Sequence, residues 1–289
     1  MIATMQPNPY EPPKANLALP QLPAENANVL TRPRIIPWRE AANWIRLGWN
    51  LYKKDWLIWL IILIIILVLA LTPPVLLGYF NFFLPYERLV LWEENSSWLS
   101  ALSILYEVII YTFLIMLSGG LYLGLAQVQQ GLPLKVAHLL AGFKDNLISL
   151  FTLGLLSSLA YQGLIGLFNQ FSQPANITEE LSFPISYLYS LFLDRPNIVG
   201  MSYFFINLLS SIFIDFTIML TTLNRMPLPT AIQKSLKGIL RNIPVMLFYL
   251  LLSSLLEIMA TLPYLLGLFI VLPLRYCSAY IAYQAIFLK

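Results

Sequence analysis

Long apolar stretches alternate with short polar segments from residue 56 to the end of the chain. A helix needs about 20 mostly apolar residues to cross the hydrocarbon core of a bilayer. Four stretches predict one span each: residues 56–78, 104–126, 147–168 and 201–223. The last 46 residues, from Pro244, are too long for one span and predict two, which turn near residues 262–267. The pattern therefore predicts an all-α membrane protein with six transmembrane helices.

Two of the polar segments resemble each other at an offset of 96 residues. They are "LPLKVAHLLAGFKDNL" (132–147) and "LPTAIQKSLKGILRNI" (228–243), which share Leu, Pro, Leu, Gly and Asn at matching positions. Each has apolar residues at helical spacing and a basic polar face, a pattern typical of a helix lying in the membrane interface. Pro133 and Pro229 suit the first turn of such a helix. We expect interfacial helices at both places.

A third, looser copy precedes the first span, at residues 36–56 with Pro37 and Gly48. The repeating unit is then an interfacial amphipathic helix followed by two spans. Three such units tile the chain from residue 36 and all point the same way across the bilayer. We therefore expect three parallel repeats, unlike the inverted repeats of many transporters.

The basic residues predict the orientation of the spans, because cytoplasmic loops carry an excess of Lys and Arg. Fourteen of the 17 basic residues flank the spans on one side, whereas the opposite loops hold only Arg88 and Arg195. Both termini are therefore expected in the cytoplasm. An even number of spans is then required, which supports dividing the last apolar region in two.

Composition agrees with a lipid environment. The chain is 58% hydrophobic and only 11% charged, whereas a soluble domain carries about 25% charged residues. The first 37 residues hold eight of the 20 prolines, which predicts a disordered, partly polyproline II cytoplasmic tail over residues 1–35. This tail is either a passive tether or a ligand for a proline-binding partner. Residues 36–289 form the predicted six-helix transmembrane domain.

The residues needed for common enzyme and metal sites are few. The chain has one cysteine, Cys277, and one histidine, His138, so it can form neither an internal disulfide nor a Cys/His metal cluster. Phosphate-binding loops, nucleophile elbows and zinc-protease motifs are absent from the sequence. We expect no enzyme activity, no cofactor and no metal. A net charge of +3 argues against nucleic acid as a partner, and His138 is expected at the surface.

Four ionisable residues fall within the predicted spans. Glu107 lies near the outer end of its span, whereas Asp215, Glu257 and Arg275 lie deeper. At about 1.5 Å rise per residue, Arg275 and Glu257 reach similar depths on neighbouring helices. A charge in the bilayer is costly unless it is paired. We expect Arg275 to pair with Glu257, with Asp215 as the second candidate. This charge cluster is either a structural staple or a coupling or substrate-binding site.

Small residues indicate where spans approach closely. Gly120 and Gly124 stand four residues apart in "SGGLYLG", the spacing that lets helix backbones come near each other in membranes. Packing within one chain is favoured over dimerisation.

Scattered motifs carry a resemblance to a family of uncharacterised bacterial inner-membrane proteins. They are "NPYEPPKA" (8–15), Gly48 with Trp49, "GGLYLG" (119–124) and "YCSAYIAYQAIF" (276–287). The resemblance implies a multi-pass protein of the inner membrane with a proline-rich cytoplasmic tail. It implies no catalytic residues.

Two functional hypotheses remain. The first is a non-enzymatic integral membrane protein with a structural, assembly or regulatory role in the bacterial envelope. The second is a small-solute or lipid transporter that uses the charge cluster of Arg275, Glu257 and Asp215. In both cases the lipid bilayer is the expected partner, together with a membrane protein of unknown identity.

Overall fold

The computed structural model describes residues 29–83, 97–171, 198–262 and 266–289, and most of the predicted tail lies outside these ranges. Six long helices occur where the six spans were predicted. They are α2 (Trp56–Phe83), α4 (Ser97–Gln129), α6 (Leu147–Phe171), α8 (Ile198–Thr222), α10 (Ile243–Thr261) and α11 (Leu268–Phe287). Among the described residues the only β-structure is one isolated bridge, between Val29 and Leu288. The predicted all-α class is confirmed.

Four of these helices contain a described stretch that is long and apolar enough to cross a membrane. The stretches are Ile104–Gln129, Leu147–Leu164, Ile243–Thr261 and Leu268–Phe287. The described apolar parts of α2 and α8, Trp56–Leu69 and Leu209–Thr222, are shorter. Length and composition therefore indicate an integral membrane protein.

Exposed apolar side chains form stripes along the outside of the bundle, as lipid contact requires. On α10 they recur every four residues at Leu247, Leu251, Leu255 and Met259, which are 39–62% exposed. On α6, Ile148 is 80% exposed. A large exposed apolar area would be unfavourable in water, so these faces indicate where the acyl chains lie.

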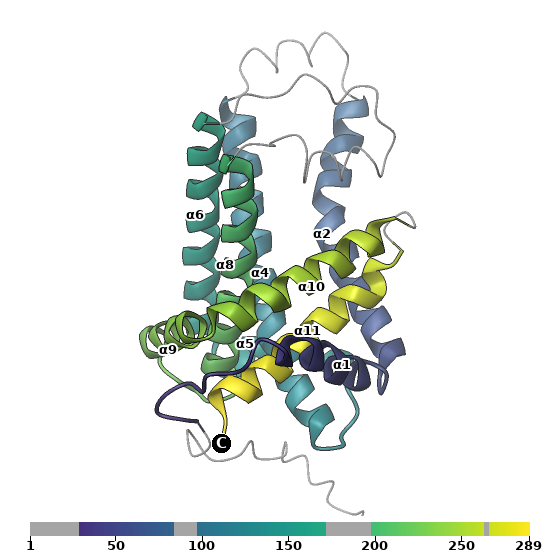
Figure 1. Ribbon diagram of the computed structural model, residues 1–289. Coiled ribbons are helices and arrows are strands. Elements are labelled where there is room, and N and C mark those ends of the chain that lie inside the picture. The colour runs from purple at the N-terminus through teal and green to yellow at the C-terminus, as the bar shows by residue number, and fades with distance from the viewer. Residues whose placement is uncertain (1–28, 84–96, 172–197, 263–265) are drawn as a thin grey trace, which may run out of the picture.

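The helices are arranged around three that contact one another pairwise, α4, α8 and α11. Figure 1 shows α2, α4, α6 and α8 running along the long axis of the molecule, whereas α10 and α11 form an oblique hairpin. The end of α10 and the start of α11 lie well short of the tops of the other helices. The hairpin therefore places its residues beside the lower and middle parts of the bundle.

Two amphipathic helices lie across the same end of the bundle, α1 (Glu40–Tyr52) and α9 (Leu228–Arg241) (Figure 1). The apolar spacing of α1 turns Ala41, Trp44, Gly48 and Leu51 inward, where the helix packs on α11. A Cβ atom at Gly48 would stand 2.8 Å from the backbone nitrogen of Ser278. Only glycine permits this close approach.

The folded region begins before the predicted boundary at residue 36. The Leu30 N–H donates to the Phe287 carbonyl at 2.8 Å, and the Arg34 N–H donates to the Ile286 carbonyl at 2.9 Å. Backbone hydrogen bonds thus hold this segment against the end of α11. The described N-terminal end and the C-terminus lie at the same end of the molecule.

The segment at residues 132–147 does not form the continuous helix predicted for it. It consists of an extended stretch, a 3₁₀ helix η1 (Val136–Leu140) and one turn of helix α5 (Gly142–Asp145). Pro133 therefore precedes a helix rather than starting one. The cause is tertiary, because the Leu134 N–H donates to Asp55 Oδ2 at 3.1 Å and Leu134 is buried. A helical backbone over residues 132–135 would move the Leu134 N–H away from Asp55 and the Leu134 side chain out of its buried position.

Candidate functional site

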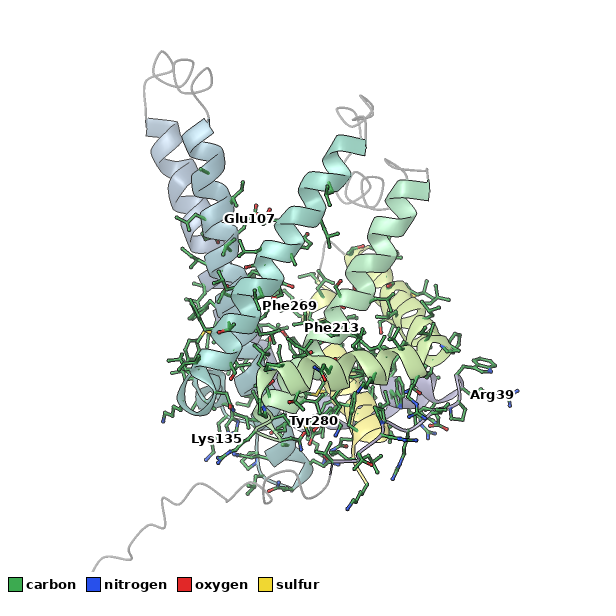
Figure 2. The ribbon with its side chains drawn as sticks, turned by 90° about the vertical axis from the view of Figure 1, so that its left-hand side faces the viewer. Arg39, Glu107, Lys135, Phe213, Phe269 and Tyr280 are labelled. Carbon is green, nitrogen blue, oxygen red and sulfur yellow. The ribbon has the colours of Figure 1, made fainter. Side chains whose placement is uncertain are left out.

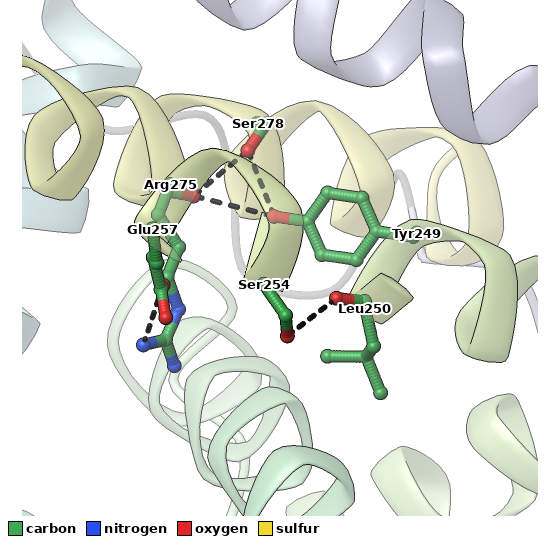
Figure 3. Close-up of polar contacts among 6 residues, drawn as sticks. All are labelled: Tyr249, Leu250, Ser254, Glu257, Arg275 and Ser278. Atoms are coloured by element: carbon green, nitrogen blue, oxygen red, sulfur yellow. Dashed lines mark hydrogen bonds and ion pairs between the residues drawn. The ribbon is translucent and has the colours of Figure 1, made fainter. Parts of the chain in front are cut away.

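The structure brings Arg275 of α11 and Glu257 of α10 together. Arg275 Nη1 and Glu257 Oε1 lie 3.6 Å apart, and the two side chains extend alongside each other (Figure 3). This separation exceeds the roughly 2.7–2.9 Å of a charge-assisted hydrogen bond. About a third of each side chain is accessible, 34% and 32%. The contact is therefore an ion pair that is only partly buried.

Asp215 approaches the same arginine from α8, a central helix next to α11. Its carboxylate acts electrostatically on Arg275, together with that of Glu257, although it forms no ion pair with the guanidinium at contact distance. The structure thus places all three predicted residues in one cluster. With all three ionised, the cluster carries one more negative than positive charge.

The backbone of Arg275 is anchored by two hydroxyl groups. Ser278 Oγ donates to the Arg275 carbonyl at 3.0 Å, and the Tyr249 hydroxyl lies 2.8 Å from Ser278 Oγ (Figure 3). Tyr249 is fully buried and its ring contacts Trp44 of α1 edge-on, with ring centres 5.7 Å apart. These contacts connect the position of the arginine to the amphipathic helix beneath it.

Sequence reasoning missed the polar groups that α4 and α11 add to the cluster. The Ser118 and Tyr276 hydroxyls form a hydrogen bond of 2.9 Å, and the rings of Tyr122 and Tyr276 lie 5.6 Å apart. The Tyr122 hydroxyl is buried beside the Asp215 carboxylate, but no hydrogen bond of ordinary geometry joins it to a described residue. The tyrosines inside the apolar stretches could have indicated these polar groups, since a buried hydroxyl needs a partner.

The hollow next to the ion pair is small. Glu257, Arg275, Ser253 and Ser278 contribute its polar lining, and Ile45 of α1 closes one side. Its free space corresponds to about one water molecule. No group of three or more His, Cys, Asp or Glu side chains suited to a metal ion occurs in the described part of the chain. The ion pair can hold charge or a proton, and this hollow can hold a water but offers no room for a larger substrate.

Glu107 stands apart from the cluster. It is exposed on α4, and Gln162 of α6 donates a hydrogen bond to its carboxylate. One turn further along α4, the ring of Tyr111 stacks on Tyr161 of α6, with centres 6.1 Å apart. These contacts join α4 to α6 outside the charge cluster.

Gly120 and Gly124 pack closely within the chain, but their partner is not another span. A Cβ atom at Gly120 would collide with the carbonyl oxygen of His138, and one at Gly124 would lie 2.9 Å from His138 Nδ1. The two glycines therefore form the surface of α4 on which η1 and the extended stretch before it rest. Neighbouring Gly142 makes the same kind of approach to Met116 on α4.

We expected His138 at the surface, but it is buried. It is 8% exposed, its Nδ1 accepts a hydrogen bond from the Lys135 N–H at 3.1 Å, and its Nε2 lies 3.0 Å from Gln127 Oε1. The accepting Nδ1 places the proton of the neutral ring on Nε2, which donates to Gln127. Burial, and secondarily the charge of Lys135, lower the pKa of His138 below its ordinary value of 6.5.

Comparison with known proteins gives no relative from which a role could be transferred. No family model, curated protein or solved structure matches this chain.

Proposed function

We propose that this protein is a non-enzymatic membrane component of the bacterial inner membrane with a structural, assembly or regulatory role. It has six spans in three parallel units, and both termini face the cytoplasm. The observation that carries the proposal is that the interior charges are engaged with one another. Arg275 lies against Glu257 and within the field of Asp215, and the adjacent hollow accommodates about one water.

Contacts between successive units support the three-unit architecture. The second span of each unit packs against the amphipathic segment of the next: α4 against η1 and α5, α8 against α9, and α11 against α1. The last of these contacts joins the third unit back to the first. The three second spans, α4, α8 and α11, also meet one another, as in a ring of equivalent units.

Backbone geometry supports the match between the second and third units. Asn146 ends α5 with φ −136° and ψ 30°, and Asn242 ends α9 with φ −125° and ψ 24°. The carbonyl of each then accepts the first hydrogen bond of the following helix, from Leu150 and Met246 respectively, at 2.9 Å in both cases. In the first unit, the Asp55 carbonyl accepts the corresponding bond from Trp59 at 3.1 Å.

The orientation is testable with reporter fusions. Fusions after residues 90, 180 and 264 are expected to report the external side, and fusions after 135, 230 and 289 the cytoplasm. A cytoplasmic signal at position 180 would overturn the six-span arrangement, because it would place the connection between α6 and α8 on the wrong side. Affinity purification of the full chain from native membranes then tests the assembly role through reproducible co-purifying membrane proteins.

A double-substitution cycle tests whether the ion pair is structural. Arg275→Leu and Glu257→Leu each leave one charge without its partner and should cost about 1–3 kcal/mol, below the range for a fully buried pair because both groups are partly accessible. The double variant should recover much of this loss in thermal unfolding of the detergent-solubilised protein. Asp215→Leu is the control for the second carboxylate. If the losses of stability in the two single variants simply added up in the double variant, a structural role for the ion pair would be contradicted.

A transporter of small solutes or lipids is the second candidate, and two observations favour it. The ion pair is a third accessible, and the buried Tyr122 hydroxyl lies beside the Asp215 carboxylate without a hydrogen bond of ordinary geometry. Both features suit a site that takes up a proton or a small polar ligand. Reconstitution in vesicles with a solute panel separates the candidates: flux that Asp215→Asn abolishes without loss of thermal stability favours transport.

A further inference from the structure

Three arginines come from the two chain segments that meet where α9 bends into α10. Arg241 is the last residue of α9, and Arg34 and Arg39 lie in the segment that leads into α1. All three side chains are exposed. None forms an ion pair with a carboxylate in the part of the chain that the structure describes. Their charges are therefore available to a partner outside the protein.

Asn242 holds the two segments together at this bend. Its Nδ2 donates to the carbonyls of Arg34 and Gly238, at 2.8 Å each, and its Oδ1 accepts from the Ile36 N–H at 2.8 Å. Asn242 is 1% exposed. The backbones of Arg34 and Arg241 are thus linked through one buried side chain. Preorganisation of this kind reduces the entropic cost of binding an anion.

Aromatic side chains fix the third arginine beside the bend. Trp38 contacts Phe248 of α10 edge-on, with ring centres 5.1 Å apart, and the guanidinium of Arg39 lies 5.5 Å from the centre of the Trp38 ring. Figure 2 shows Arg39 pointing outward at the edge of the molecule, at the end where the nitrogen-bearing side chains gather. Trp38 remains 50% exposed, which suits the level of lipid headgroups.

An apolar track leads away from the arginines. Leu240 and Ile243 are 59% and 42% exposed at the bend, and the exposed stripe of α10 continues from Leu247. The surface thus combines three exposed arginine residues, whose chain segments meet at the bend, with an apolar strip along α10. Arginine binds phosphate oxygens with two parallel hydrogen bonds, and the strip matches an acyl chain.

We propose that this surface, formed by Arg34, Arg39, Arg241, Trp38 and the stripe of α10, binds an anionic phospholipid. The arginines hold the headgroup phosphate, and an acyl chain lies along Leu240, Ile243 and Leu247. The proposal rests on the orientation given above, in which α1 and α9 lie at the cytoplasmic leaflet. Anionic lipids of that leaflet attract basic juxtamembrane segments.

The test is thermal unfolding of the full-length protein in detergent during titration with dioleoylphosphatidylglycerol. We expect the melting temperature to rise with this lipid and to change little with dioleoylphosphatidylcholine, which has the same chains. The variant Arg34→Gln, Arg39→Gln, Arg241→Gln should bind the anionic lipid about tenfold more weakly, as expected for lost charge-assisted hydrogen bonds. The matched control is Lys54→Gln, Lys144→Gln, Lys289→Gln, which removes the same charge from exposed positions at the same end and should retain the response.

Three results would overturn the proposal. An equal loss of affinity for the anionic lipid in the arginine and lysine variants would show non-specific attraction to a basic surface. Equal stabilisation by phosphatidylcholine would show that the headgroup charge plays no part, and equal stabilisation by soluble glycerol phosphate would show a phosphate site without lipid. Should the triple variant fail to fold, Arg241→Gln alone gives the same readout, since its backbone contacts are unchanged. The reporter fusions test the orientation separately, so the two proposals fail by different measurements.

Discussion

The segments 132–147 and 228–243 share a sequence pattern but differ in structure. The later copy forms one continuous amphipathic helix, α9, whereas the earlier copy is divided into an extended stretch, η1 and α5. Nevertheless the same positions face inward over the second half of each copy, whereas earlier Leu134 is buried and its counterpart Thr230 is exposed. Gly142 and Gly238 are buried, as are Leu139 and Ser235, whereas Leu140 and Leu236 are 59% and 48% exposed. In this second half the shared pattern thus determines which face is buried, and the packing partner determines the backbone.

The partners of the two copies explain this difference. The earlier copy rests on the glycine surface of α4, where Gly120 brings backbone against backbone. The later copy packs on α8, where Ser235 Oγ donates to the Phe213 carbonyl at 3.0 Å, and on the ring of Phe287. At Gly238 the closest neighbour is a side chain, the Phe287 ring, which leaves room for a regular helix. A backbone partner at van der Waals distance requires the chain to follow its surface.

Glycine substitution should show the largest contrast. In Gly142→Ala the new methyl group collides with the Met116 carbonyl, and the backbone of α4 cannot move without disturbing the centre of the bundle. We expect a loss near 3 kcal/mol, at the upper end for overpacking. In Gly238→Ala the obstacle is the ring of Phe287, and alanine favours the helix by about 1 kcal/mol. The loss there should be about 1 kcal/mol, measured by thermal unfolding in detergent. Equal losses would contradict the distinction between backbone and side-chain partners.

Asparagine substitution should give the next largest effect. Asn242→Ala removes three hydrogen bonds and leaves the partly buried Ile36 N–H and Arg34 carbonyl without the Asn242 side chain, so it should cost about 2 kcal/mol. Asn146 occupies the equivalent position, but none of the described residues hydrogen-bonds to its side chain. Asn146→Ala should therefore cost less than about 0.5 kcal/mol. Comparing the two variants in chemical denaturation checks this, and a cost at Asn146 matching that at Asn242 would show that the local turn, not the bond to Ile36, matters.

The pH dependence should show the smallest effect. His138 corresponds to Lys234 in the later copy, and burial lowers the pKa of both. Because the folded pKa of His138 is below 6.5, the unfolded chain binds a proton more readily. The contribution of His138 to stability is therefore present above pH 6.5 and is lost as the pH falls toward the folded pKa.

Melting temperatures between pH 8 and pH 5 measure this effect. We expect His138→Gln to flatten the slope below pH 6.5, because glutamine keeps a neutral polar side chain. Lys234→Gln is the control and should leave that part of the slope unchanged, because lysine stays protonated there. An unaltered slope in His138→Gln would assign the titration to other groups.

The sequence by itself determined those features that depend only on a single segment and its lipid environment, such as the positions of the long helices. Apolar length alone placed α2, α4, α6, α8, α10 and α11, because each helix satisfies its own backbone in lipid. Depth along two antiparallel helices brought Arg275 to Glu257, since the rise per residue is constant. Helical periodicity also predicted amphipathic helices at α1 and α9.

Tertiary structure alone decided which surfaces meet. Hydropathy did not reveal that Gly120 and Gly124 would contact η1 rather than a span, or that His138 would be buried between Lys135 and Gln127. It also did not reveal the pinning of Arg34 to the end of α11, or the gathering of Ser118, Tyr122 and Tyr276 beside Asp215. These contacts join residues far apart in the chain, and they depend on shape and hydrogen-bond geometry. Lipid is as apolar as the helices themselves, so polarity alone cannot select one helix partner over another.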